Sequence, residues 1–505
     1  MAYSIEQQPS KFVAVNSPLV YVVKEDNGAI TGAAKFRYII QVQISMSNTA
    51  SLSTVAKLKL HKNKAGVAIA DVSKIVRTYI ATQQRDENSN TNTIHNLGVN
   101  VTAKPFSLND SQAVAIRILG GYETATNQTS APVENLTPET DTTAYTSNVA
   151  VGIPATTPYT QTATNVGGLD VEGTNFPLNL YKNDTTQPQF HKFLTNAPTV
   201  QFVRGSSTSA DNVDLMTICF KQGDDDSGNS SIITVGKKIE QIAIQYYDSS
   251  DNAIAGTSGG ATVHFFANNT TNGGATVAQS TSVDRAILYF GCGTKNLETQ
   301  AVASVIDSEG ATVTGANARP SNFSNWAYYK IFGCTSADVA NICTKEYKFY
   351  RYGASRTGID DRHQSCSRYD NVRLAWRNRL GAWDYMNFRG KSTESVDITS
   401  EEMESVPGTW DLATYSYGNY ERGKETLYTE ATRKLVINSD YLNEEEAQWL
   451  EELFTSIDVQ IIEDSIIYPV VITNKTYTKK TSVNDKIKIQ YTINLEYANK
   501  VRTNS

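Results

Sequence analysis

Three clusters of charged side chains in this 505-residue sequence have residue types that could carry chemistry. The first is the acidic run at 224–229, DDDSGN, whose carboxylates are the oxygen ligands that calcium prefers. An EF-hand loop needs glycine at its sixth position, but the sixth residue counted from Asp224 is Asn229. No helical pattern flanks the segment. We therefore predict an acidic, solvent-exposed turn rather than a calcium site.

The second cluster places His363 three residues before Cys366, with Asp360 and Asp361 just upstream. A structural zinc site takes four ligands at short spacings, and no further ligand lies near this group in the sequence. The remaining histidines and cysteines are scattered and contain no CxxC pair: His61, His95, His191, His264, Cys219, Cys292, Cys334 and Cys343. We predict no metal site and no cofactor, and we expect the cysteines to be buried thiols in a reducing compartment.

Motifs for catalysis or nucleotide binding are scarce in this sequence. It contains no Walker loop, no GxGxxG fingerprint and no HExxH pair. The paired carboxylates of a glycosidase have no sequence signature, so a glycan-degrading enzyme remains the least favoured alternative. We predict that the protein is not an enzyme, and we name no catalytic residue.

The third cluster consists of three arginines near two tryptophans. These residues are Arg373, Arg377, Arg379, Trp376 and Trp383. Arginine can bind phosphate or sugar, but beside aromatic residues it more often stacks on a ring or pairs with a carboxylate. The formal net charge of −7 argues against a non-specific nucleic-acid binder, which needs a basic face. We favour a structural role, with Asp384 and the acidic run 444–446 as candidate carboxylate partners.

These arginines belong to the strongest local pattern in the chain, a predicted β-hairpin. Apolar and polar residues alternate through VRLAWR, a loop at 378–382 contains Gly381, and a second alternation runs through WDYMNF. The residues that we assign to this structural hairpin or interface are Trp376, Arg377, Asn378, Arg379, Gly381, Trp383, Asp384 and Tyr385. We predict that they build architecture rather than a ligand site.

Strand patterns dominate the rest of the chain, and tyrosine and glycine are abundant, with 27 and 31 copies. We predict a mainly β fold with two or three antiparallel β-sandwich-like domains, few short helices and one long Thr/Asn-rich arm. The predicted parts are an N-terminal β-domain at 1–122, an extended arm or linker at 123–177, a second β-domain at 178–350 and a C-terminal β-domain at 351–505. The arm has few large apolar residues, so it cannot bury much surface.

Two helices are predicted within this β-rich chain. The first covers 72–79, where Val72, Ile75, Val76 and Tyr79 form an apolar stripe and Asp71 or Ser73 would cap the start. The second begins after Asn443, and Glu446 follows three residues later, as in a capping box. Its buried stripe would consist of Ala447, Leu450, Leu453 and Phe454.

The order of several segments resembles that of virion proteins from tailed bacteriophages, including the short-tailed crAss-like phages. These segments are FRYIIQVQI, GVAIADVSKIVRTYI, FLTNAPTVQFV, CSRYDNVRLAWRNRLGAWDYMNF, AQWLEELFTS, DVQII and YPVVIT. A WxNRxGxWDYxxF-like hairpin is a recurrent fold landmark of that group, and the matching residues are Trp376, Asn378, Arg379, Gly381, Trp383, Asp384, Tyr385 and Phe388. Ala382 stands where a second glycine is commoner. The resemblance covers mainly residues 12–82, 192–220 and 366–473.

This resemblance implies a structural subunit of a bacteriophage tail, assembling as a multi-copy ring in the tail barrel through which DNA passes. The expected partners are copies of itself, about six or twelve in a closed head-to-tail ring, and adjacent tail proteins. Sequence-specific nucleic-acid binding is not expected. The alternative is a receptor-binding, fibre-docking or head-decoration virion protein, since tyrosine-rich strands can stack on glycans.

The expected location is the virion tail, after folding in the host cytoplasm. The start of the chain, MAYSIEQQPSKF, lacks the apolar core of a signal peptide. No apolar run approaches the roughly 18 residues that a membrane helix needs. We therefore expect no membrane insertion.

Overall fold

The computed structural model of the protein describes most of the sequence in separate stretches. Apart from short gaps inside them, these are residues 3–45, 52–80, 114–136, 150–153, 193–205, 213–221, 241–254, 263–267, 287–298, 326–334, 344–352 and 368–504, together with residues 95, 146–147, 305–307, 312–313 and 342. The chain divides into two compact units. The first comprises Met1–Ser365 and Arg377–Asp384, and the second comprises Cys366–Trp376 and Tyr385–Ser505.

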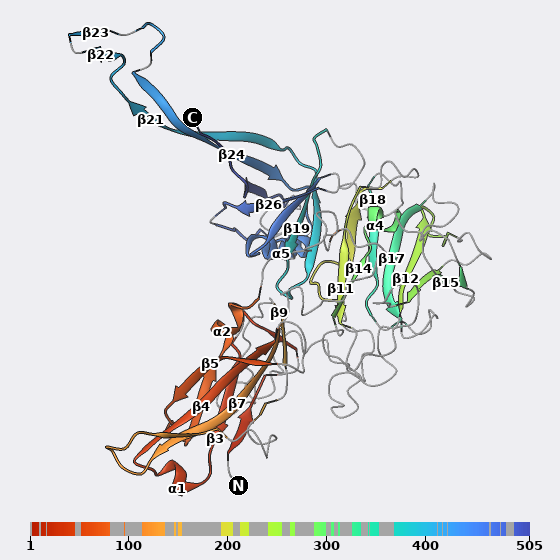
Figure 1. Ribbon diagram of the computed structural model, residues 1–505. Coiled ribbons are helices and arrows are strands. Elements are labelled where there is room, and N and C mark those ends of the chain that lie inside the picture. Colours follow the sequence, from red (N-terminus) through yellow and green to blue (C-terminus); the bar gives the residue numbers. More distant parts are fainter. Residues whose placement is uncertain are drawn as a thin grey trace. The chain divides into compact units, whose positions relative to one another are not determined.

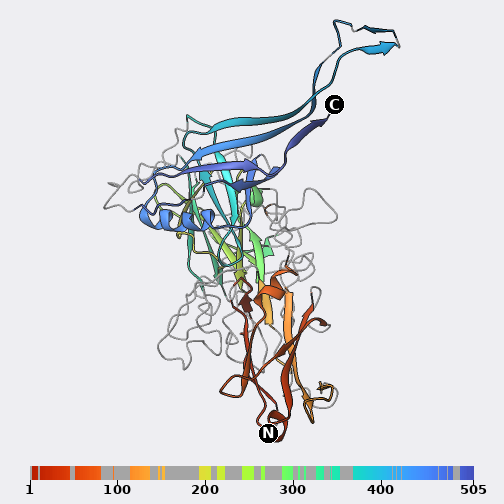
Figure 2. The same ribbon diagram turned by 90° about the vertical axis from the view of Figure 1, so that its left-hand side faces the viewer.

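The first unit begins with a β-sandwich, which contains the strands coloured red to orange in Figures 1 and 2. One sheet has the order β1-β3-β6, with β1 Ser4–Gln7, β3 Val20–Lys24 and β6 Val67–Asp71. The other has the order β2-β9-β7-β4-β5, with β2 Phe12–Ala14, β9 Ala150–Ile153, β7 Val114–Ala125, β4 Lys35–Ser45 and β5 Ser53–Leu60, while β8 Val133–Asn135 also pairs with β7. Tyr21, Ile40 and Ile116 come from three different strands and lie in one buried core.

The alternating pattern of KFRYIIQVQI explains why β4 is the central strand of the larger sheet. Tyr38, Ile40, Val42 and Ile44 alternate along it and are buried. β4 pairs antiparallel with β5 on one side and with β7 on the other. Both pairings agree with the antiparallel strand that this sequence predicts.

The sheet also takes two strands from the 123–177 span, which we predicted to be an arm. β8 pairs antiparallel with β7, and β9 pairs antiparallel with β7 and in parallel with β2. These strands place residues 133–135 and 150–153 in the N-terminal sandwich, so its sheet continues past the predicted boundary at 122. Residues 137–145 and 154–192 lie outside the described residues.

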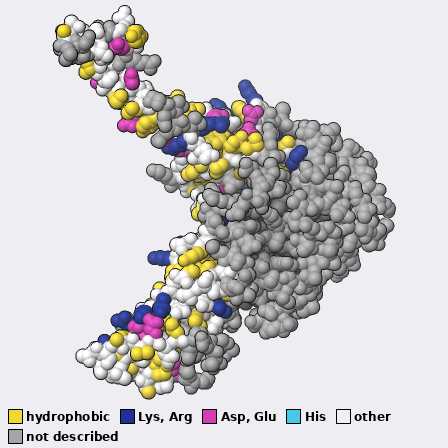
Figure 3. All heavy atoms as spheres, in the orientation of Figure 1, with side chains coloured by type: hydrophobic (Ala, Val, Ile, Leu, Met, Phe, Trp, Pro, Cys, Tyr) yellow, Lys and Arg dark blue, Asp and Glu magenta, His cyan; other side chains and the backbone are white. Residues whose placement is uncertain are grey.

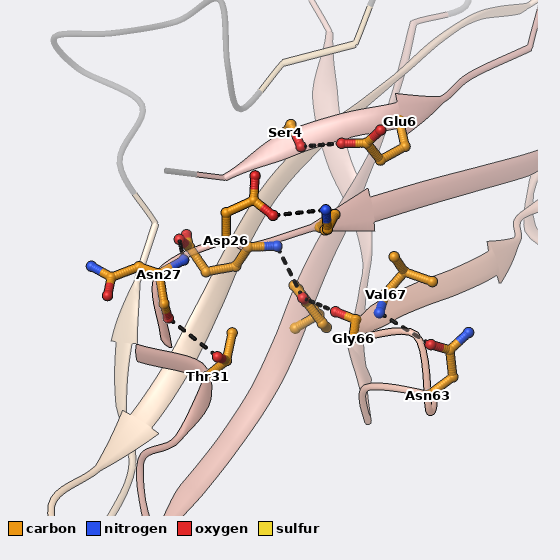
Figure 4. A network of polar contacts seen from close by, with 11 residues as sticks. Ser4, Glu6, Asp26, Asn27, Thr31, Asn63, Gly66 and Val67 are labelled. Atoms are coloured by element: carbon orange, nitrogen blue, oxygen red, sulfur yellow. Dashed lines mark hydrogen bonds and ion pairs between the residues drawn. The ribbon is translucent and has the colours of Figure 1, made fainter. Parts of the chain in front are cut away.

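Two short helices and their loops close the sandwich. α1 is Gly28–Thr31, and α2 is Ser73–Arg77 within the predicted 72–79. The Oδ1 atom of Asp71 accepts hydrogen bonds from the backbone N–H groups of Ser73 and Leu19, both at 3.0 Å. Figure 4 shows the loop contacts near α1, where Asn63 Oδ1 accepts from the Val67 N–H at 3.1 Å. Short polar side chains thus satisfy the exposed turns locally.

A second β-body of the first unit contains a seven-stranded sheet. Its order is β10-β18-β17-β12-β13-β15-β16, with β10 Val200–Val203, β18 Tyr347–Arg351, β17 Trp326–Cys334, β12 Gln241–Asp248, β13 Val263–Ala267, β15 Val305–Asp307 and β16 Thr312–Val313. β11 Thr217–Lys221 pairs with β14 Ile287–Gly291, and α4 covers Thr294–Glu298. The β10–β18 pair is parallel, unlike its neighbours. Buried Tyr246, Trp326 and Tyr329 form an aromatic group on this sheet.

The second unit is built on a sheet with the order β20-β19-β25-β26-β27-β24-β21, and β28 also pairs with β24. These strands are β19 Val372–Arg377, β20 Trp383–Phe388, β21 Thr393–Glu404, β24 Lys424–Asn438, β25 Val459–Glu463, β26 Ile466–Ile472, β27 Thr492–Tyr497 and β28 Val501–Asn504. β22 Thr409–Asp411 and β23 Thr414–Ser416 form a separate small hairpin. Together these sheets confirm the predicted mainly β fold with antiparallel pairing.

Helix α5, Glu444–Phe454, has the predicted capping box. Asn443 Oδ1 accepts from the Glu446 N–H at 2.7 Å, and Glu446 Oε2 accepts from the Asn443 N–H at 2.8 Å. The predicted stripe residues Ala447, Leu450 and Leu453 are buried. The sequence therefore predicted both the start and the inward face of this helix correctly.

Candidate functional site

The hairpin that carries the predicted site residues forms where the sequence places it. β19 ends at Arg377 and β20 begins at Trp383, which leaves the five-residue loop at 378–382. Gly381 has φ of 83°, a backbone conformation that glycine adopts without the strain that a Cβ atom would cause. The tip, Arg377–Asp384, belongs to the first compact unit, whereas the rest of both strands belongs to the second.

Asn378 is the centre of a buried hydrogen-bond network at the tip. Its Nδ2 donates to the Leu194 carbonyl at 2.9 Å and to Asp384 Oδ1 at 3.0 Å. Its Oδ1 accepts from the N–H groups of Leu380 and Ala382, each at 3.0 Å. These four bonds use both amide hydrogens and both oxygen lone pairs. Because Asn378 is only 3% exposed, this side chain acts as a structural pin for the loop.

The segment 193–197 completes the network around Asp384. Thr195 Oγ1 donates to Asp384 Oδ1 at 2.7 Å and accepts from the Ala197 N–H at 2.9 Å. The Asp384 side chain is buried. The carboxylate therefore receives hydrogen bonds from two neutral side chains, Thr195 and Asn378. This segment belongs to FLTNAPTVQFV, in which no pattern indicates that Thr195 lies against the hairpin.

The hairpin arginines face aromatic rings, as the sequence predicted. The guanidinium of Arg377 lies 5.0 Å from the ring centre of Trp383, and its Nη1 donates to the Gly381 carbonyl at 2.9 Å. The guanidinium of Arg373 lies 5.5 Å from the ring centre of Tyr385. Arg373 and Arg377 are 1% and 2% exposed, so neither can reach a phosphate group in solvent. Arg379, by contrast, is half-buried.

The two tryptophans of the hairpin have separate packing partners. Trp376 is fully buried and packs against Trp449 of α5, with ring centres 4.9 Å apart. The ring centres of Trp383 and the buried His95 lie 4.7 Å apart, and the two rings are nearly perpendicular. His95 thus has a packing role, and its backbone carbonyl accepts from Asn296 at 2.8 Å.

The other predicted chemical clusters cannot be placed. The acidic run 224–229 lies outside the described residues, and so do Asp360, Asp361, His363 and Cys366. We did not name the run 256–260, GTSGG, among the candidate motifs, although it has the GxSxG spacing of a nucleophile elbow; it also lies outside the described residues. Within the described stretches, no three His, Cys, Asp or Glu side chains gather as a metal site. Cys219, Cys292 and Cys334 are buried.

A second feature, which we did not predict from the sequence, is a long two-stranded ribbon formed by β21 and β24. We call this ribbon, with the small hairpin β22–β23 at its end, the β-arm. It stands away from the body of the second unit in Figures 1 and 2. All 12 residues of β21 are exposed. The exposed large hydrophobic residues of the β-arm are Val396, Ile398, Met403, Val406, Tyr415, Tyr420 and Leu427.

The two faces of β21 differ in chemistry because side chains alternate along a strand. Val396 and Ile398 point to one face and are 50% and 69% exposed. Asp397 and Glu401 point to the opposite face and are also exposed. Figure 3 shows hydrophobic and acidic side chains side by side on the β-arm. The face of Val396 and Ile398 also carries Glu394, Glu402 and Glu404, so both faces hold negative charge and only this one offers apolar surface.

Ion pairs between the two strands help to hold the ribbon together. Arg433 pairs with Glu394 at 2.7 Å, and Lys434 pairs with Asp397. The hydrogen bond to Asp397 raises the pKa of Lys434 above its usual value. Exposed pairs of this kind contribute little to stability, so they cannot replace a buried core.

Comparisons with known proteins add no family to these observations. No family model matches the chain, and no curated protein matches it. One solved structure with a detectable likeness is the native conformation of E. coli alpha-2-macroglobulin. The TM-score is 0.16 and the identity is 9%, over 86% of this chain and 22% of that one. The chain thus spans about a fifth of that protein, and so low a score carries no argument.

Among the described residues, no helix has the length and apolar character needed to cross a bilayer.

Proposed function

We propose that this protein is a non-catalytic structural subunit of a bacteriophage tail, present in the virion as a multi-copy ring around the path of the DNA. The observation that carries the proposal is the β-arm, a 12-residue strand paired with a 15-residue strand and exposed along most of its length. β24 also pairs with β28 at 428–431 and with β27 at 434–438, so among the described residues the β-arm has only two strands beyond Glu401 and Tyr428. Isolated two-stranded ribbons are at best marginally stable in water. A ribbon that also exposes Val396, Ile398 and Val406 is suited to burial against a neighbouring subunit.

The hairpin landmark supports the same function from the sequence. Apart from the half-buried Arg379, its residues are buried in packing and hydrogen bonds, which suits a role in architecture. The formal net charge of −7 would weaken adhesion to DNA that moves past the subunit. Adjacent tail proteins would contact the remaining surfaces.

The proposal is tested by the mass of the purified full-length chain in solution and by electron microscopy of virions that contain it. Ring-shaped assemblies of the chain, or a ring at its position in the tail, are the expected result. A matched control removes residues 402–427 and joins Glu401 to Tyr428, which face each other in the ribbon, through an Asn-Gly turn, so that β24 keeps the residues that pair with β28. This shortened variant should fold and associate more weakly than the parent. A parent chain that is monomeric at all concentrations, with no ring in the virion, would contradict the proposal.

The alternative as a receptor-binding virion protein has one observation in its favour. Tyr415 and Tyr420 lie toward the end of the β-arm and are 44% and 87% exposed. Exposed tyrosine rings can stack on sugars. Binding of the isolated chain to a glycan array, lost in Tyr420→Ala, would favour this alternative over the ring.

A further inference from the structure

Two strands of this chain have an open edge, and their chemistry is complementary. Within the described residues, β5 pairs only with β4, and β21 pairs only with β24. An open edge presents unpaired backbone N–H and C=O groups that can accept a further strand. We infer that β21 of one copy adds to the open edge of β5 in the next copy. This inference rests on the proposed function, because it names the interface that would join neighbouring subunits.

The charges along the two edges have opposite sign. Residues 53–64, from the start of β5 into the following turn, contain four lysines and no acidic residue. β21 contains five acidic residues and no basic one. The residues are Lys57, Lys59, Lys62 and Lys64 on the first edge, and Glu394, Asp397, Glu401, Glu402 and Glu404 on the second. Opposite charges of this kind steer two surfaces together and fix their register.

Both edges retain charge that their own neighbours do not neutralise. Lys57 and Lys59 share Glu134 at 2.7 and 3.0 Å, and Lys59 also contacts Glu123 at 2.6 Å. Two carboxylates therefore face these two lysines, whereas Lys62 and Lys64 extend the positive charge beyond them. Figure 3 shows lysine and arginine side chains gathered beside acidic ones on the N-terminal sandwich.

The edge of β21 also retains charge that its own neighbours do not neutralise. Glu394, Asp397 and Glu402 pair with Arg433, Lys434 and Lys424 of β24. Glu401 and Glu404 stand outside these three pairs and are exposed. They provide the negative charge that a basic edge would attract.

The apolar faces of the two strands match as well. On β5, Leu58 and Leu60 are partly buried and pack against the sandwich core, while Lys57 and Lys59 point to solvent. On β21, Val396 and Ile398 share one face with Glu394, Glu402 and Glu404 nearer the ends of the strand, and Asp397 and Glu401 occupy the other face. A strand added beside β5 continues both of its faces. β21 can therefore extend the apolar core with Val396 and Ile398 while Asp397 and Glu401 meet the lysines.

This contact is head-to-tail, because it joins two different surfaces of the same chain. Such heterologous contacts close into a ring when the rotation between copies permits, and otherwise continue as a filament. The geometry of the inferred contact thus agrees with a cyclic assembly, whereas a two-fold contact would stop at a dimer.

The test uses charge reversal in the full-length chain, with association measured by analytical ultracentrifugation. Glu401→Lys/Glu404→Lys alters the acidic edge without breaking the three ion pairs of the β-arm. Lys57→Glu/Lys64→Glu alters the basic edge and leaves Lys59 beside the buried Glu123. Each double variant should weaken association by at least about tenfold, and the combination of all four changes should restore it. Asp370→Lys/Glu463→Lys, an equal charge change at two exposed sites away from both edges, should have no comparable effect.

Mixing the two double variants gives a further readout that a loss of folding cannot imitate. In the mixture the intact β21 of one variant can meet the intact β5 of the other, and the two reversed edges can also meet, so mixed assemblies should form, whereas each variant alone should associate only weakly. Association also should slow hydrogen exchange at the amides of residues 393–404 in the parent chain.

Three other outcomes would contradict the inferred contact, and each would point to a different error. If the parent assembles and both double variants assemble equally well, the contact is elsewhere, and the ring function stands without it. If the parent never associates, both the contact and the ring function are wrong. If the amides of β21 become protected only when another virion protein is added, the partner is not a second copy.

Discussion

The hairpin tip and the β-arm are both formed by two antiparallel strands, yet they treat polar and apolar groups in opposite ways. The tip buries its polar side chains and satisfies them, with four hydrogen bonds to Asn378 alone. The β-arm exposes apolar side chains such as Ile398, which is 69% accessible. A satisfied buried network fixes one conformation of a loop, whereas exposed apolar surface needs a partner. The comparison separates a hairpin that organises its own chain from one that is suited to contact another.

The largest expected effect comes from removing an aromatic anchor of the first hairpin. Trp376→Ala should lower the free energy of unfolding by about 3–5 kcal/mol, because it leaves a cavity against Trp449. Trp383→Ala should cost a similar amount, since Arg377 and His95 lose their aromatic partner. Urea unfolding followed by circular dichroism measures both effects.

Trp376→Phe is the matched control, because it retains an aromatic ring beside Trp449 and should cost less than Trp376→Ala. If the two alanine variants unfold at the parent midpoint and only lose binding to a partner, the first hairpin is a contact surface. The distinction between the two hairpins would then fail.

The second expected effect concerns the polar network. Asn378→Ala should destabilise the protein by about 2–4 kcal/mol, because the N–H groups of Leu380 and Ala382 lose their acceptor in a buried loop. Asn443→Ala, which removes the cap of α5 at an exposed position, should cost only about 1 kcal/mol. Thermal unfolding of the two variants side by side measures the difference. Equal losses would show that burial adds nothing to the network at the tip.

The first hairpin could be predicted well because the sequence signals for it lie within the hairpin itself. Alternation on both strands and the glycine in the loop set the limits of β19 and β20, and the aromatic neighbours of Arg373 and Arg377 indicated stacking. The capping box of α5 was equally readable, since Asn443 and Glu446 are three residues apart. Local signals of this kind act over one turn or one strand, so composition and spacing reveal them.

Contacts between distant segments were not predictable by the same reasoning. Thr195 meets Asp384 across 189 positions, and no pattern in FLTNAPTVQFV indicates that partner. The Thr/Asn-rich composition of 123–177 suggested an arm, but residues 133–135 and 150–153 join the N-terminal sheet through backbone bonds that composition does not specify.

The β-arm was missed for a different reason. Its strands carry mostly polar residues on both faces, so they lack the apolar alternation that identifies a half-buried strand. Opposite charges do pair along the two strands, as Glu394 does with Arg433 and Asp397 with Lys434. Such pairs are recognisable only once the register is known.

A smaller effect is expected at the turn of the first hairpin. Gly381→Ala should cost about 1–2 kcal/mol, because φ of 83° places a Cβ atom in a strained conformation. Gly66, with φ of 79°, is the matched control, since a Cβ atom there would meet nothing within 4 Å. Chemical denaturation of both alanine variants measures the costs. A larger loss of unfolding free energy at Gly381 would show that packing around the added Cβ atom adds to the cost. Equal losses would show that the backbone conformation accounts for all of it.

The smallest effect on stability is expected on the β-arm, at its most apolar position. Ile398→Thr keeps a β-branched side chain on β21 and removes exposed apolar surface, so the unfolding free energy of the monomer should change by less than about 0.5 kcal/mol. Association, measured by ultracentrifugation of the same sample, should nevertheless weaken, because the proposed contact buries this side chain. A loss of more than about 1 kcal/mol in the monomer would mean that the chain itself covers Ile398 in solution. The β-arm would then be a second self-contained hairpin, and the contrast with the tip at Asn378 would no longer separate architecture from assembly.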